Sequence, residues 1–128
     1  MKFGYTILYV SDVLATIDFY ESAFGLERGM VHESEFAELN TGATRLAFAR
    51  DEFVRQMLPL PFESARLSSA PAPMEIALVT KDVEAAYARA VTAGAVAIQA
   101  PISKPWGQVV GYVRDLNGFI VELCSPLK

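Results

Sequence analysis

Residues that commonly carry chemistry are scarce in this sequence, which holds one cysteine, one histidine and one tryptophan among 128 residues. With Cys124 alone, no disulfide can form within the chain, and its apolar neighbours favour a buried side chain over a reactive thiol. With His32 alone, one subunit cannot supply the two histidines and one carboxylate of a non-haem iron site. Disulfide scaffolds and self-contained iron sites of this kind are therefore excluded.

Runs of one charge and long apolar runs are also missing. The net charge is -4 and the 11 lysine and arginine residues are scattered singly, so no basic stripe can neutralise phosphates. The apolar stretch 85–102 is interrupted by Arg89, Gly94, Gln99 and Pro101, so it is unfit to span a bilayer as one helix. The amino terminus lacks the pattern of a signal peptide. We expect a cytoplasmic protein that binds neither nucleic acid nor membranes.

The chain does contain enough apolar material for one core. Hydrophobic residues make up 52% and charged residues 20% of the sequence, and the mean hydropathy is +0.27. Such a composition is not that of an intrinsically disordered chain. The length of 128 residues matches one ordinary domain. We therefore expect a single domain that folds without a partner.

A repeat organises the sequence. Residues 5–13 and 75–83 read alike, because each is a β-branched and aliphatic run with an aspartate, Asp12 or Asp82, suited to cap a helix. Each aspartate is followed by an apolar stripe at helical spacing. The stripes are Val13, Ile17, Tyr20 and Phe24 in the first copy, and Val83, Tyr87, Ala90 and Gly94 in the second. Each copy thus predicts a strand followed by a helix.

Three short apolar runs, separated by turn residues, complete each copy, so the sequence predicts the order βαβββ twice. The first module covers about residues 1–50 and the second about 74–128, within one domain that spans 1–128. A connector rich in proline and serine covers about 51–73. The predicted fold class is α+β, with the helices on one face of the sheet and a trough on the other.

Alternation along the strands predicts which side chains face the trough. If Leu8 packs under the first helix, then Tyr5 and Tyr9 face the opposite side. The same reasoning in the second copy places Glu75 and Glu122 together on the trough face. Two carboxylates among apolar neighbours are costly, unless a cation lies between them or one pKa rises. This pair is the strongest chemical signal in the sequence.

The two copies contribute side chains of different polarity to the predicted site. Alignment of the turn glycines Gly42 and Gly118 makes Leu46 the first-copy counterpart of Glu122. The four equivalent trough positions are then Tyr5, Leu46, Glu75 and Glu122. The polar residues lie in the second copy and the apolar ones in the first.

The two ends of the chain resemble the vicinal oxygen chelate superfamily, which contains glyoxalase I, extradiol dioxygenases and bleomycin-type antibiotic-resistance proteins. The residues that carry the resemblance are 9–13, 18–26, 105–107 and 112–123, and the match covers nearly the whole chain. The resemblance implies two βαβββ modules that form a curved mixed sheet around a concave trough, with the helices outside. It also implies a homodimer, since the family often completes its troughs with a second subunit.

Enzymes of this family typically bind one divalent metal ion through the first and last strands of each module. The corresponding positions here are Tyr5, Leu46, Glu75 and Glu122, of which Glu122 matches the family pattern and Leu46 lacks a ligating atom. Two carboxylates and a phenol would favour a hard ion such as Mg²⁺ or Ca²⁺, and only weakly. Because His32 is the one histidine in the chain, we do not expect a ring-cleaving dioxygenase.

Each candidate residue has a structural alternative. Glu75 and Glu122 are either solvated residues or a site for a metal or cationic ligand. His32 is either an exposed strand residue or a ligand contact. Trp106 either caps the core or stacks on a flat ligand. Packing competes with a ligand-binding role for the remaining aromatic candidates, which are Tyr5, Tyr9, Phe48 and Tyr112.

Two functions remain in view. The first is a small-molecule-binding protein that holds a flat or cationic ligand in an aromatic-lined trough, without chemistry. The second is a metal-dependent lyase or isomerase of the glyoxalase type, in which Glu122 and Glu75 act as ligands or as a catalytic base. We expect binding rather than catalysis, because the metal positions of the first copy are degraded.

Overall fold

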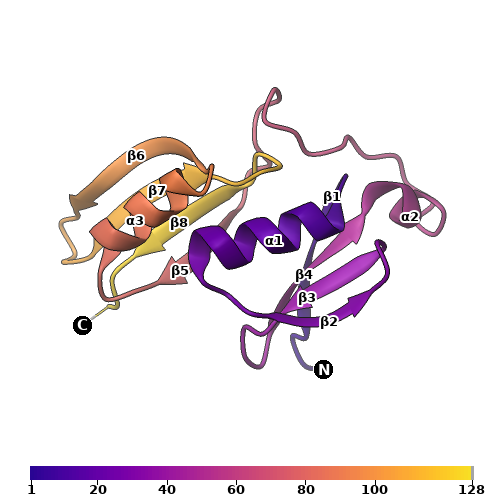
Figure 1. The fold of residues 1–128 in the computed structure, drawn as a ribbon, viewed down its shortest axis with the longest axis horizontal. Coiled ribbons are helices and arrows are strands. Elements are labelled where there is room, and N and C mark those ends of the chain that lie inside the picture. Colours follow the sequence, from indigo (N-terminus) through magenta and orange to yellow (C-terminus); the bar gives the residue numbers. More distant parts are fainter. Residues whose placement is uncertain (128) are drawn as a thin grey trace. The chain divides into compact units, whose positions relative to one another are not determined.

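The structure is a computed structural model that describes residues 1–127. The chain divides into two compact units, Met1–Ala65 and a second that begins at Arg66, and each holds one four-stranded mixed sheet. Both units follow the order strand, helix, strand, strand, strand, so the predicted α+β fold and its repeat are confirmed (Figure 1). In the part of the chain that is described, no helix is long and apolar enough to cross a membrane.

The first unit is built around α1 and four strands. Its elements are β1 (Tyr5–Val10), α1 (Val13–Phe24), β2 (Arg28–His32), β3 (Phe36–Leu39), β4 (Arg45–Arg50) and α2 (Asp51–Arg55). The strand order is β1-β4-β3-β2, with β1 parallel to β4 and the other pairs antiparallel. The outer strand β1 therefore lies beside the last strand of its own module.

Helix α1 begins and ends where the sequence predicts. The carboxylate of Asp12 accepts a hydrogen bond from the backbone N–H of Ala15 at 3.0 Å, and Gly25 ends the helix in the left-handed conformation (φ 68°). The apolar stripe of α1 is buried against β3 and β4, and Tyr20 is fully covered. The cap at Asp12 fixes the start of the helix, and the apolar stripe fixes which side of the helix faces the sheet.

The second unit repeats this arrangement. Its elements are β5 (Glu75–Val79), α3 (Val83–Thr92), β6 (Val96–Ser103), β7 (Val109–Arg114) and β8 (Ile120–Cys124). The strand order is β5-β8-β7-β6, with β5 parallel to β8. Asp82 caps α3 by accepting a hydrogen bond from Ala85 N–H at 3.1 Å. Val113 and Val121 are fully buried in the core of this unit.

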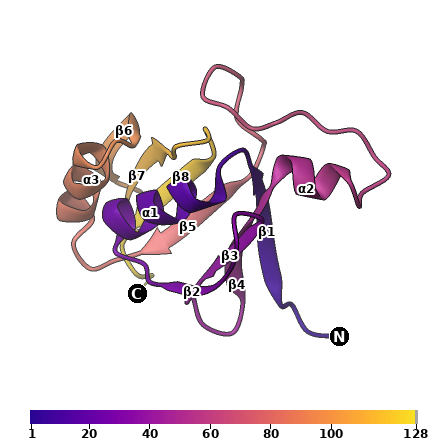
Figure 2. The same cartoon turned by 45° about the vertical axis from the view of Figure 1, so that its right-hand side comes forward.

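The predicted connector contains an element that the sequence did not indicate. Helix α2 occupies Asp51–Arg55 and buries Val54. Five residues are too few to show a helical period, so the helix depends on packing and on charges that suit its dipole, acidic in the first turn and basic in the last. Figure 2 shows α1 and α2 on opposite sides of the first sheet.

The register of β4 corrects two predictions. Phe48 packs its ring on Tyr20 of α1, with the centroids 4.9 Å apart, and is fully buried, so it faces the helix rather than the trough. Leu46 shares this face by alternation and is 6% exposed. Thr6 pairs with Leu46 and Ile7 with Ala47, whereas Ala77 pairs with Glu122.

The counterpart of Glu122 in the first unit is therefore Ala47, not Leu46. The segment from the turn glycine to the equivalent strand position is one residue longer before β4 than before β8. Alignment of Gly42 with Gly118 therefore shifts β4 by one position relative to β8. A one-residue shift exchanges the two faces of a strand. We call the sheet face that points away from α1 or α3 the open face of each unit.

Candidate functional site

A carboxylate pair lies on the open face of the second unit. Glu122 on β8 is flanked in register by Ala77 of β5 and Tyr112 of β7, and Glu75 lies on the same face of β5. The Tyr112 hydroxyl donates a hydrogen bond to Oε1 of Glu122 at 3.2 Å. Three of the predicted site residues are thus brought together.

The electrostatics of this pair favour an added proton. Desolvation raises the pKa of Glu75 above its ordinary value of 4.5, and both a hydrogen bond to Glu122 and the charge of Glu122 raise it further. Glu75 lies on the edge strand β5 as an exposed residue, so solvent can reach its side of the pair. The pair can share one proton, or it can attract a cation.

Neighbouring groups respond to the same charges. Burial raises the pKa of Tyr112, and its hydrogen bond to Glu122 raises it further. Burial also raises the pKa of the Cys124 thiol to about 11, again with a contribution from Glu122. Cys124 is 3% exposed, as expected for a buried small side chain, and its thiol is protonated at neutral pH.

The donor set does not fit a resident divalent metal ion. Across residues 1–127, no three histidine, cysteine, aspartate or glutamate side chains gather closely enough to hold one. Within this range the protein supplies only the carboxylates of Glu75 and Glu122, because the Tyr112 phenol is protonated and donates to Glu122, so water would have to fill most positions around Mg²⁺ or Ca²⁺. Two carboxylates without a third protein ligand in the described part of the chain make at most a weak site, so these residues do not fit a tightly held resident ion.

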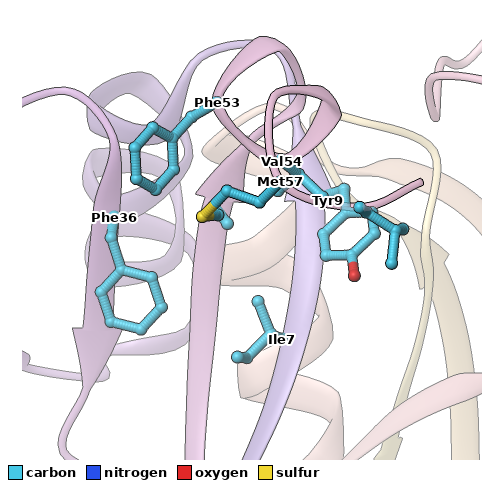
Figure 3. Close-up of a pocket in the computed structure, with 8 residues that line it drawn as sticks. Ile7, Tyr9, Phe36, Phe53, Val54 and Met57 are labelled. Carbon is cyan, nitrogen blue, oxygen red and sulfur yellow. The ribbon is translucent and has the colours of Figure 1, made fainter. Parts of the chain in front are cut away.

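The first unit contains an apolar pocket on its open face, between the sheet and α2. The cavity measures about 310 Å³. Figure 3 shows the rings of Phe36 and Phe53 on one side of the cavity and the ring of Tyr9 on the other. The lining residues are Ile7, Tyr9, Phe36, Ala49, Phe53, Val54, Met57 and Leu58. Pockets that bind small molecules are concave and mostly apolar in this way.

The strand register explains the floor of this pocket. Tyr9 pairs with Ala49 and Ala49 with Phe36, so the three side chains form one row across β1, β4 and β3. His32 pairs with Phe36 and extends the row onto β2 as an exposed residue. The small side chain of Ala49 leaves the space between the two aromatic rings.

A hydrogen-bonded latch fixes the wall beside Tyr9. The Tyr9 ring packs on Phe62 with the centroids 5.0 Å apart, and the Arg55 guanidinium lies 4.4 Å from the centre of the Phe62 ring. Arg55 also donates hydrogen bonds to Glu52, to Ser64 and to the carbonyl oxygen of Phe62. We call Arg55, Phe62 and Tyr9 the latch.

Two other candidates, Tyr5 and Trp106, lie apart from the groups described above. Tyr5 is 56% exposed at the start of β1 and does not line the pocket. Trp106 is 63% exposed in the loop between β6 and β7, where its indole N–H donates to Oε1 of Gln108 at 2.8 Å. Trp106 therefore does not cap the core of its unit.

Sequence reasoning missed the α2 side of the pocket. Phe53, Val54, Met57 and Leu58 have the spacing of an apolar helix face, but that signal lies in a segment interpreted as a connector. It also missed Glu38, which pairs with Ala47 and is 8% exposed. Arg45 lies 3.3 Å from the carboxylate of Glu38, which places a neutralised ion pair on the open face of this unit.

Three solved structures illustrate the fold. A glyoxalase-related enzyme from Fulvimarina pelagi has a TM-score of 0.84 at 21% identity, covering 98% of this chain and 88% of its own. A glyoxalase/bleomycin resistance protein/dioxygenase from Nocardioides has a TM-score of 0.79 at 18% identity, covering 100% and 85%. TioX from Micromonospora sp. ML1 has a TM-score of 0.71 at 22% identity, covering 98% of both chains. At these identities the likeness concerns the fold alone.

Family membership rests on the sequence itself. No curated protein is significantly similar to this chain. The family model described as the Glyoxalase/Bleomycin resistance protein/Dioxygenase superfamily matches residues 2–123. That range covers the first βαβββ module, the second up to the penultimate residue of β8, and the motifs at both ends of the chain. The chain therefore belongs to the glyoxalase/bleomycin resistance protein/dioxygenase superfamily.

Proposed function

We propose that this protein binds a flat, largely apolar small molecule in the pocket of its first unit. The observation that carries the proposal is a cavity of about 310 Å³ whose eight lining residues are aromatic or aliphatic, apart from one thioether and one phenol. A cavity of this size is at the lower end of the range for small-molecule sites. Burial of an apolar ligand there would be driven by the hydrophobic effect.

Binding without chemistry is favoured by the composition of the pocket. The lining contains no carboxylate, imidazole, thiol or amine that could act as an acid, base or nucleophile. The carboxylate pair Glu75 and Glu122 belongs to the second unit and supports a role in holding a proton or a cation. The alternative of a metal-dependent lyase or isomerase is tested by elemental analysis of the purified protein and by metal affinity in Glu122→Gln.

The pocket is tested with N-phenyl-1-naphthylamine, an uncharged probe whose fluorescence rises in apolar surroundings. We expect saturable binding to the wild-type protein. Ala49→Phe places a ring inside the cavity and should reduce probe affinity at least tenfold without lowering the melting temperature. Ala88→Phe adds the same side chain to the exposed surface of α3 and is the matched control.

Two results would count against the proposal. Either a lack of saturable fluorescence in the wild-type protein or equal affinities of wild type and Ala49→Phe would remove the pocket as the binding site. The homodimer implied by the family remains a prediction, and sedimentation equilibrium with and without the probe tests it.

A further inference from the structure

The pocket offers one hydrogen-bonding group of ordinary strength. Among its eight lining side chains, the Tyr9 hydroxyl is the one O–H or N–H group, and the Met57 thioether is only a weak acceptor. Within residues 1–127 the Tyr9 side chain makes a ring contact with Phe62 and its hydroxyl has no hydrogen-bond partner. A half-buried phenol without a partner at a cavity wall is positioned to bind a polar atom of a ligand.

Charged side chains do not line the pocket. The carboxylate of Glu38 lies one row away on the same face, beside Ala47, and the guanidinium of Arg45 neutralises it at 3.3 Å. A charged ligand group would lose its hydration in this cavity without gaining a partner of opposite charge. The lining therefore selects uncharged ligands.

The volume sets the size of the ligand. An engineered apolar cavity of about 150 Å³ accommodates one benzene ring. The cavity of about 310 Å³ is about twice as large, which suits a compound of two fused rings. The rings of Phe36 and Tyr9 lie on opposite sides of the cavity (Figure 3), and aromatic walls of this kind favour a flat aromatic ligand.

Within the latch, Phe62 and Arg55 restrict the position of the Tyr9 ring. Phe62 packs against the Tyr9 ring, and Arg55 holds Phe62 through its guanidinium and through the hydrogen bond to the Phe62 carbonyl oxygen at 3.2 Å. Ser64 and Glu52 fix Arg55 in turn, at 3.0 Å and 2.8 Å. Arg55 does not line the pocket, so it acts on the ligand only by positioning Tyr9.

We infer that the ligand is an uncharged two-ring aromatic compound with one hydroxyl or carbonyl group that hydrogen-bonds to the Tyr9 hydroxyl, and that Arg55 positions Tyr9 through Phe62. This inference rests on the proposed function, because it names the ligand class of the same pocket. Tyr9 is the residue that discriminates among flat ligands of equal size.

The test compares four probes of nearly equal shape, namely naphthalene, 2-naphthol, 2-naphthoate and 2-naphthylmethylammonium, by displacement of N-phenyl-1-naphthylamine. We expect both uncharged compounds to displace the probe and both charged compounds to bind at least tenfold more weakly than 2-naphthol. In Tyr9→Phe, the affinity for 2-naphthol should fall about fivefold relative to that for naphthalene, the effect of one typical hydrogen bond.

Arg55→Ala tests the positioning role. The ratio of naphthol to naphthalene affinity should fall towards the Tyr9→Phe value, whereas general loosening of the pocket would weaken both compounds alike. Arg55→Lys keeps a cation above Phe62 and should restore part of the ratio. Arg66→Ala, an exposed residue of the second unit, is the matched control.

The results separate this inference from the proposed function. If the uncharged probes bind and Ala49→Phe blocks them, but Tyr9→Phe leaves the affinity ratio unchanged, then the ligand class is wrong and the pocket stands. Equal affinities for 2-naphthol and 2-naphthoate would also overturn the ligand class. An unchanged ratio in Arg55→Ala would overturn the positioning role. Failure of every probe to bind would overturn the pocket itself.

Discussion

The hydroxyl group of Tyr112 donates a hydrogen bond to Oε1 of Glu122 across the strands β7 and β8, at 3.2 Å. The two residues are direct partners in the antiparallel register, so the backbone fixes the donor beside the acceptor. Glu75 approaches the same carboxylate from β5 on the other side. Glu122 thus lies between a donor and a like charge.

Loss of this donor should destabilise the second unit. In Tyr112→Phe, the half-buried Glu122 carboxylate loses the tyrosine donor, and the free energy of unfolding should fall by about 1 kcal/mol. Urea denaturation at pH 7 measures this change. The double variant Tyr112→Phe/Glu122→Gln should show a smaller effect of the tyrosine change, and strict additivity would contradict a direct interaction.

Glu75→Gln should change the pH dependence of stability. Because the pKa of Glu75 is raised in the folded state, the folded protein binds this proton more tightly, and its stability falls as the pH rises from 4.5 through the raised pKa. The variant lacks this loss, so its melting temperature should exceed that of the wild type at pH 8 by more than at pH 4. Glu27→Gln, which changes an exposed glutamate of the first unit in the same way, is the matched control.

Cys124 should be unreactive in the folded protein. With its pKa raised to about 11 and its side chain buried, the thiolate is scarce and inaccessible at neutral pH. We expect 5,5′-dithiobis(2-nitrobenzoate) to react at pH 7.5 only after urea unfolds the chain. Equal reaction rates with and without urea would show that the thiol is exposed.

The two faces of the first sheet should differ in their sensitivity to mutation. Phe48→Ala removes a fully buried ring beneath α1 and should cost about 3–5 kcal/mol of unfolding free energy. Tyr5→Ala removes an exposed ring and should change stability by less than about 0.5 kcal/mol. Chemical denaturation of both variants measures these values, and a small effect of Phe48→Ala would contradict the register of β4.

The sequence predicted most of the fold because its signals were local and repeated. Asp12 and Asp82 cap their helices as expected, and Gly25 has the left-handed conformation that the end of a helix favours. Strand alternation alone predicted on which face of the sheet the side chains of Tyr9 and Glu122 lie. The sequence did not predict the short helix α2, because five residues are too few to show a periodic pattern and its stability depends on packing.

The site was predicted less well, because register is a property of strand pairs. The glycine alignment placed Leu46 opposite Glu122, whereas the hydrogen-bonded ladder makes Ala47 the equivalent. For Phe48 the sequence leaves both a packing role and a ligand-binding role open, because aromatic side chains suit a core and a binding site, and only its contact with Tyr20 decides between them.

The sequence by itself determined the repeated βαβββ order, the family, and the adjacency of Glu75 and Glu122 on one face of a strand pair. These follow from periodicity, capping residues and motifs within short segments. Only the tertiary structure showed the apolar pocket between the first sheet and α2, and the latch of Arg55, Phe62 and Tyr9. The reason is physical, since a cavity forms where packing between elements is incomplete, and no local sequence pattern records that space.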